Sequence, residues 1–310
     1  MSKSMNSSVI LIKNEVTPGT DAIPTGAANA ILIRNMTMNP LQGDTVSRDL
    51  IRPYFGNSEQ LLAGIHNKVD FEVELAGSGA AGTAPAWGPV LRACGFAETI
   101  TPATDAKYAP ITSDAETASI YVFIDGLFHK MTGCLGSVAF DITAKGIPFM
   151  KFQFVGAYHD VIDQPNPAVV DFTKFKMPRI ASKENTPQWS LHGESGCLQA
   201  LQVDMANSTP WRSLIGCEGA KLTDRKPAGS ISMELGSVAD KDWWSAVKNT
   251  VSAPLTITHG IDAGNIIVLD APKVQLSNIQ YADQEGVLMM NSSITVNPNV
   301  GNDELVITVK

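Results

Sequence analysis

The chain has 310 residues, of which 44% are hydrophobic and 17% charged, and its formal net charge is −8. This length and apolar content suffice for one large or two ordinary domains. The sparse Lys and Arg argue against a surface that grips nucleic acid, because phosphate binding needs concentrated positive charge. The sequence has no apolar run of about 18 residues and no secretory leader pattern, so it predicts neither a membrane span nor a signal peptide.

Residues 1–29 are rich in Pro, Gly, Thr and Ala and lack helical periodicity. They predict an extended N-terminal arm with too little patterned apolar content to fold alone, which becomes ordered on contact with another chain. Strands are expected next at residues 30–36 and 45–53, on either side of a turn at residues 40–43.

The following strand, VDFEVEL at residues 69–75, alternates apolar and acidic side chains and runs into GSGAAG at residues 77–82. The G-x-G-x-x-G spacing is typical of dinucleotide-binding turns, but there the preceding strand is buried on both faces. Here Asp70, Glu72 and Glu74 share one face and would repel a phosphate. The stretch is therefore not interpreted as a nucleotide-binding turn, and the acids are interpreted as a solvated or lumen-facing surface.

A short helix is expected around residues 87–93, and strands at 119–128, 135–143 and 149–156. The last two predict a hairpin, because apolar and polar residues alternate along the first of them. The Pro-rich stretch at residues 164–187 predicts a linker.

Beyond the linker the order of elements repeats. A helix is expected that opens with acids and closes with Lys and Asn, as the helix dipole favours. The expected strands lie at residues 198–206, 211–217, 230–235, 255–259, 266–270, 274–280, 287–296 and 305–309, and the helix at 240–249. The sequence thus predicts a mainly β fold of two tandem sandwich or barrel domains, residues 30–163 and 188–310, each flanked by one helix and related by a diverged duplication.

We find no pattern typical of catalysis. The five histidines lack metal-binding spacing, and the four cysteines are far apart and expected to be buried thiols. Ser195 stands in GESG, which lacks a residue of the G-x-S-x-G elbow. Trp87, Trp243 and Trp244 are interpreted as anchors between helix and sheet, with a sugar-binding platform as the alternative. The sequence therefore predicts no enzyme, no cofactor and no metal.

Several stretches together carry a resemblance to a known family. They are TPGTD at residues 17–21 with PT at 24–25, VDFEVELAGSGAAGTAPAWGPVLRACGF at 69–96, IDGLFHK at 124–130 and GCLGSV at 133–138. The chain resembles the major tail tube proteins of long, non-contractile-tailed bacteriophages. The resemblance covers nearly all of the first half. In the second half it covers only the architecture, where GSVA at 236–239 stands in place of GSGAAG.

The resemblance implies a β-sandwich flanked by one helix, assembly into stacked rings around a β-lined lumen, passage of genomic DNA and no active site. It also implies that the glycines at residues 77–82 allow a tight turn off the strand and close backbone packing, without a phosphate. If a ring of single-domain subunits has six members, two domains per chain imply three chains with pseudo-sixfold symmetry. The implied partners are further copies of the chain and the tape measure, distal tail and terminator proteins. The DNA would pass without being bound, and the protein would assemble in the host cytoplasm and reside in the virion tail, with no membrane partner.

Acidic residues on amphipathic strands are candidates for the lumen wall or for contacts between chains, because a conduit that neutralised phosphates would bind its DNA. These candidates are Asp70, Glu72, Glu74, Asp141, Asp204 and Glu234. We also expect the chains to join edge to edge through their sheets, since few charges block the strand edges. Two other functions fit a β-rich chain: a receptor-binding or decoration protein of the virion, and a carbohydrate-binding β-sandwich.

Overall fold

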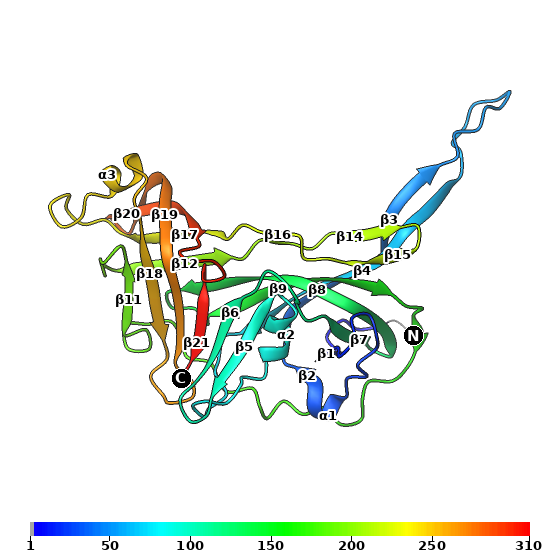
Figure 1. Cartoon of the computed structure of the whole chain (residues 1–310), viewed down its shortest axis with the longest axis horizontal. Helices are drawn as coiled ribbons and strands as arrows, with labels where there is room; N and C mark the ends of the chain where they lie inside the picture. The colour runs from blue at the N-terminus through cyan, green and yellow to red at the C-terminus, as the bar shows by residue number, and fades with distance from the viewer. Residues whose placement is uncertain (1–2) are drawn as a thin grey trace.

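A computed structural model describes residues 3–310 of the chain (Figure 1). Strands dominate it, and its helices are short: α1 is Gly26–Asn29, α2 is Gly88–Arg92 and α3 is Trp243–Lys248. The strands pack as an open β-sandwich, with no closed barrel in the part of the chain that is described. The predicted mainly β fold is confirmed in its sandwich form.

One antiparallel sheet, which we call the long sheet, runs through both halves of the chain. Its strands are, in spatial order, β3 (Arg34–Ser47), β4 (Gln60–Glu74), β9 (Phe149–Tyr158), β8 (Leu127–Thr143), β12 (Leu198–Asp204), β17 (Ala228–Glu234), β20 (Val287–Asn297) and β19 (Ile267–Gln284). The sheet passes from the N-terminal half, residues 3–163, to the C-terminal half, residues 188–310, where β8 pairs with β12.

Further strands pair with the first parts of β8 and β19 and complete the sandwich. Beside β8 lie β7 (Ala118–Ile124), β1 (Ser8–Asn14) and β2 (Ala30–Ile31); beside β19 lie β18 (Ser252–His259) and β11 (Gln188–Leu191) on one side, and β21 (Val306–Val309), β6 (Asp105–Pro110) and β5 (Phe96–Thr101) on the other. Because β6 comes from the N-terminal half and β21 from the C-terminal half, the two halves are joined by backbone pairing at a second place.

The connection between β12 and β17 makes a long excursion over the N-terminal half (Figure 1). It contains two small ladders, β13 (Asn207–Ser208) with β16 (Asp224–Arg225) and β14 (Trp211–Leu214) with β15 (Cys217–Ala220). The excursion lies across β4, β8 and β9, and the rings of Trp211 and His66 stack with centroids 5.6 Å apart.

The main hydrophobic core extends through both halves. Phe71 of β4 packs against Phe152 and Phe154 of β9, with ring centroids 5.6 and 5.9 Å away. Trp87, just before α2, packs on Tyr108 and donates a hydrogen bond from its indole nitrogen to the carbonyl of Ala76. The tryptophan therefore anchors α2 to the sandwich, as the sequence predicted, and its buried N–H has a partner.

The prediction of a free arm is wrong for residues 8–14, which form β1. This strand pairs along its whole length with β7. Ile10 and Ile12 lie in the main core, and Leu11 lies in a second cluster with Phe123 and Phe128 on the other face. The unbroken apolar run VILI is the reason, because a strand buried on both faces needs no alternation. Residues 1 and 2 of the predicted arm lie outside the described residues.

Several predicted strand boundaries are also wrong. The strand predicted at residues 211–217 is a hairpin of β14 and β15, with its turn at residues 215–216. The chain does not reverse at residues 40–43, where Leu41 has a positive φ and forms a bulge within β3; the reversal comes at residues 48–59. Residues 125–126 form a tight turn that separates β7 from β8, so the strand predicted at 119–128 is divided. Conversely, the two strands predicted at residues 266–270 and 274–280 are one strand, β19, with a bulge between Ala271 and Val274, the partners of Leu255 and Ala253.

The Pro-rich stretch at residues 164–187 connects the two halves along the body of the molecule (Figure 1). It is packed against that body: Val170 and Phe172 cover the second cluster, and the backbone of Ala181 pairs with Lys145 and Gly146. The expectation for the cysteines holds for Cys94 and Cys134, whereas Cys197 and Cys217 are exposed.

Candidate assembly surfaces

The long sheet has one apolar and one polar face. Along β4, Val69, Phe71 and Val73 are buried, so the alternate residues point away from the core. The pairing register across the sheet shows the same alternation in the other strands, so that their outward residues share one surface. The outward residues, which we call the polar face, include Asp70, Glu72, Glu74, Lys151, Gln153, Ser137, Ala139, Asp141, Gln202, Asp204, Ser230, Ser232, Glu234, Asn291, Ser293, Thr295, Gln275 and Ser277.

All of the acidic candidates lie on this polar face. Glu72 stands opposite Lys151, Lys151 opposite Ala139, and Ala139 opposite Asp204. The residues come from separate strands in both halves, and the β8–β12 pairing brings them onto one surface. The alternation of apolar and polar residues correctly predicted which face of each strand is polar. It could not predict which strands lie next to one another in the sheet.

Glu72 is neutralised within the polar face. Its carboxylate accepts hydrogen bonds from Arg34 and Asn35, each at 2.8 Å. The guanidinium of Arg34 also lies over the ring of Phe149, 4.0 Å from its centroid. Such a held ion pair presents little net charge to an approaching molecule.

Asp141 is neutralised in a similar way. It is 8% exposed and accepts hydrogen bonds from Thr143 at 2.9 Å and Gln202 at 2.8 Å, and the ammonium of Lys151 lies 3.7 Å from it. Because Asp141 belongs to β8 and Gln202 to β12, this hydrogen bond from an amide to a carboxylate connects the two halves on the polar face.

The other acids have different surroundings. Burial raises the pKa of Asp70, and the nearby Lys68 opposes that rise. Asp204 accepts a hydrogen bond from the backbone of Ala206 at 2.7 Å. Glu234 raises the pKa of the Cys197 thiol by hydrogen bonding and by its negative charge, which disfavours the thiolate.

The C-terminal part of the polar face is made mainly of neutral polar side chains. These are Ser230, Ser232, Asn291, Ser293, Thr295, Gln275 and Ser277. This neutral surface was not predicted, because the candidate residues were chosen by their charge. The signal was present in the alternation of Ser, Thr and Asn with apolar residues along residues 287–296.

Both ends of the long sheet have open edges within residues 3–310. At one end, β3 pairs only with β4. At the other end, β19 beyond Gln275 pairs only with β20, since its pairing with β18 stops there. Unpaired N–H and C=O groups along a strand edge are a template for another strand.

The hairpin of β3 and β4 projects from the body (Figure 1), and its end carries exposed apolar side chains. They are Leu41, Val46, Leu50, Ile51, Tyr54, Phe55, Leu61 and Leu62. Ile51 and Phe55 have as much exposed surface as in an extended chain, at 103% and 107%. An apolar group of this size on one projection is typical of a protein interaction site. This apolar group was not predicted, because its side chains follow no regular period.

The GSGAAG stretch holds the two halves close together. Gly77 donates its backbone N–H to Asn265 at 2.6 Å, and Gly79 donates to the carbonyl of Gly264 at 2.9 Å. A Cβ on Gly77 would lie 2.1 Å from the carbonyl oxygen of Gly264, which is an impossible contact. Close backbone packing is the role of this glycine, as predicted.

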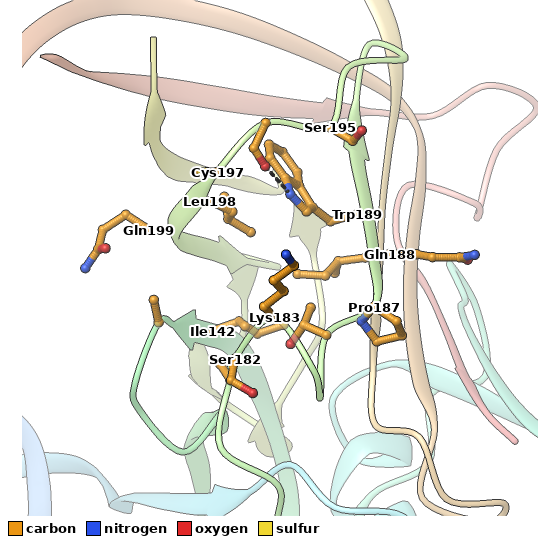
Figure 2. A pocket seen from close by; sticks show the side chains of 15 residues that line it. Ile142, Ser182, Lys183, Pro187, Gln188, Trp189, Ser195, Cys197, Leu198 and Gln199 are labelled. Carbon is orange, nitrogen blue, oxygen red and sulfur yellow. Dashed lines mark hydrogen bonds between the residues drawn. The ribbon is translucent and has the colours of Figure 1, made fainter. Parts of the chain in front are cut away.

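A hollow of about 540 Å³ lies where residues 181–189 pass the β8–β12 junction (Figure 2). Figure 2 shows Lys183, Gln188 and Trp189 around it, and the indole of Trp189 donates a hydrogen bond to the carbonyl of Gly196. Among residues 3–310, its lining includes the Cys197 thiol but no carboxylate or histidine. Within residues 3–310, no group of three or more His, Cys, Asp and Glu is placed to hold a metal ion.

A polar-faced sheet with two open edges, and a hairpin whose apolar end is exposed within residues 3–310, are typical of a mainly β structural subunit that joins other chains. The family model described as phage tail tube protein matches residues 5–302, and the chain belongs to this family. Membership makes it a structural protein of the phage virion tail, where it self-assembles into a tube with other tail proteins. No curated protein matches the chain. None of the helices in residues 3–310 has the length and apolar character to span a membrane.

Proposed function

We propose that this chain polymerises as stacked rings that form the tail tube and conduct genomic DNA during ejection. The single observation that carries the proposal is the long sheet, which is open at both edges and polar on the face away from the core. Repeating such a sheet around an axis pairs every edge strand and leaves one continuous polar wall.

We further propose that each half is one tube-type unit, so that three chains make a ring of pseudo-sixfold symmetry. Support comes from equivalent connections in the two halves. The pairings β1–β7, β3–β4, β7–β8, β8–β9 and β8–β10 (β10 is Ile162–Asp163) have the counterparts β11–β18, β12–β17, β18–β19, β19–β20 and β19–β21. One short helix follows β4, and another follows β17.

In this proposal the polar face lines the lumen. Most of its side chains are neutral or internally paired. The cations on this face without an ion-pair partner among residues 3–310 include Lys68 and Lys273. Because such cations are few, the DNA gains little counterion release by binding. The unpaired carboxylates repel the duplex within a Debye length of about 8 Å at physiological salt. The tape measure, distal tail and terminator proteins are the expected neighbours along and at the ends of the tube.

The hairpin of β3 and β4 would be buried against another copy in the assembled tube. Permanent assemblies usually bury more than about 2,000 Å², and the apolar end of the hairpin supplies part of such an interface. Changing Ile51 and Phe55 to Asp should therefore block assembly. The same change should leave the unfolding free energy of the monomer within about 0.5 kcal/mol, because both side chains are solvent-exposed in it.

Electron microscopy of the purified protein tests assembly, and rings or tubes are expected. A strictly monomeric species at high concentration, under every salt condition, would refute the proposal. The lumen assignment is tested by changing Asp70 and Glu74 to Lys, with Asp160 and Glu184 changed to Lys as a charge-matched control away from the polar face.

Intact tubes with slowed DNA ejection for the Asp70 and Glu74 variant alone would support the lumen assignment. Failed assembly of that variant would instead place these acids at a contact between subunits. Equal ejection rates in both variants would show that they are an ordinary solvated surface.

A further inference from the structure

We infer that the junction between neighbouring chains repeats the junction between the two halves of one chain, residue by residue. The inference rests on the proposed ring. It adds the identity of the two joining strands, β19 of one copy and β3 of the next, and their register.

The internal junction is the pairing of β8 with β12. It places Ala139 opposite Asp204, Asp141 opposite Gln202, and Thr143 opposite Ala200. In the equivalence of the halves, β8 corresponds to β19 and β12 to β3. These counterparts are the two strands whose edges are open in the single chain. The long sheet therefore ends with the same two kinds of edge that it joins in its middle.

The register follows from the last residues of β4 and β17, Glu74 and Glu234, which we take as equivalent. Glu74 pairs with Phe149, which pairs with Asp141. In the C-terminal half, Glu234 pairs with Met289, and Met289 pairs with Ala282. Ala282 is thus the counterpart of Asp141.

The other strand is placed in the same way. Gln202 pairs with Ser230, which lies four residues before Glu234. The residue four before Glu74 is Asp70, and its partner on β3 is Thr37. Thr37 is therefore the counterpart of Gln202, and Ala282 of one copy should stand opposite Thr37 of the next. The same steps place Gln280 opposite Asn39 and Gln284 opposite Arg34.

The side chains in this register are compatible. Ala282 and Thr37 are small, the amides of Gln280 and Asn39 can hydrogen bond to each other, and no like charges face one another across the junction. The two strands also end in a similar way. The bulge at Leu41 lies two residues beyond Asn39, and the chain leaves the sheet at Ala206, two residues beyond Asp204, the counterpart of Asn39.

The equivalence also gives the apolar hairpin a place. After β12 the chain runs across β4, β8 and β9 of the N-terminal half as the β14–β15 excursion. The counterpart of this excursion is the hairpin of β3 and β4. It should therefore lie across β17, β19 and β20 of the neighbouring copy. This would cover side chains such as Ile51 and Phe55, which are fully exposed within residues 3–310 of one chain.

Cysteine cross-linking tests the register. In a background with the exposed Cys197 and Cys217 changed to Ser, Thr37→Cys and Ala282→Cys are combined and the assembled protein is oxidised. Directly opposed residues on antiparallel strands have Cα atoms about 4.5–5.5 Å apart, within the range that a disulfide spans. We expect a covalent ladder on a non-reducing gel that ends at the ring size, a trimer.

Two matched pairs serve as controls. Ala139→Cys with Asp204→Cys, at the internal junction, should form a disulfide without any increase in mass. Thr37→Cys with Gln280→Cys is shifted by two residues, to about 7–8 Å, and should cross-link at least tenfold less.

The result that overturns the inference is a failure of Thr37 and Ala282 to cross-link in tubes that electron microscopy shows to be intact, or preferential cross-linking of the shifted pair. Either outcome would leave the proposed tube standing. Absence of tubes from the unmutated protein would instead refute the proposed function itself.

Discussion

Replacing Ile10 by Ala tests whether the N-terminal segment belongs to the folded core. Ile10 is fully buried at the centre of β1, opposite Val122 of β7. Truncating a buried Ile to Ala typically costs about 2–5 kcal/mol, because transfer free energy is lost and a cavity remains. Against a typical total stability of roughly 5–15 kcal/mol, the loss is a large fraction of the whole.

The assay is urea unfolding of the unassembled protein, followed by tryptophan fluorescence. Lys13→Ala is the matched control, because Lys13 lies on the same strand but is exposed, and it should change the unfolding free energy by less than about 0.5 kcal/mol. Deleting residues 3–14 should abolish cooperative folding, since Ile10, Leu11 and Ile12 are lost together. Equal unfolding curves for Ile10→Ala and the unmutated protein would refute the reasoning and restore a free arm.

Three further predictions concern stability. Gly77→Ala should destabilise the fold by at least about 1–3 kcal/mol, because the added Cβ would clash with backbone atoms of the other half. The control is Gly196→Ala, whose Cβ would have no atom within 4 Å and which should be nearly neutral in the same urea assay. The carboxylate of Glu15 accepts hydrogen bonds from Thr117, Ser119 and the backbone of Gly133. Glu15→Ala should therefore lower the unfolding free energy by about 1–3 kcal/mol for each donor left without a partner. An unchanged melting temperature would contradict this. Burial lowers the pKa of His192 and of His259. As the pH drops below about 6.5, these histidines therefore bind protons more readily in the unfolded chain than in the folded one, and the unfolding free energy should fall. A flat profile of unfolding free energy between about pH 7.5 and 5.5 would exclude this effect.

The sequence predicted the strands whose pattern is local. Alternation identified the core face of β4 and the β8–β9 hairpin, and Asp242 begins α3 as an N-cap by accepting from the backbone of Ser245 at 2.8 Å. The Asp125-Gly126 turn could also have been read, since this dipeptide is a strong signal for a two-residue hairpin turn.

The pairings between the halves could not be predicted. Whether β8 meets β12, or β21 meets β6, depends on strands more than 50 residues apart in sequence, and no local pattern encodes such a choice. The acidic candidates were therefore found one strand at a time, and only the register across β8 and β12 places them on one surface. The apolar hairpin was missed because its exposed apolar side chains follow no regular period along the strands.

The charge pairs on the polar face lead to a prediction about how a tube would avoid holding its DNA. Both Glu72→Gln and Glu74→Gln remove one negative charge, so a wall that works by overall repulsion should respond equally to the two changes. In the structure, however, the carboxylate of Glu72 accepts from Arg34 at 2.8 Å, whereas that of Glu74 has no such cation among its described hydrogen-bond or ion-pair partners. Losing the Glu72 carboxylate would free a guanidinium to bind a phosphate, and each such contact adds to binding through counterion release. We therefore expect Glu72→Gln to slow DNA ejection more than Glu74→Gln, with the difference shrinking as salt is raised. Equal rates for the two variants at low salt would mean that the acids act through their summed charge rather than by neutralising neighbouring cations.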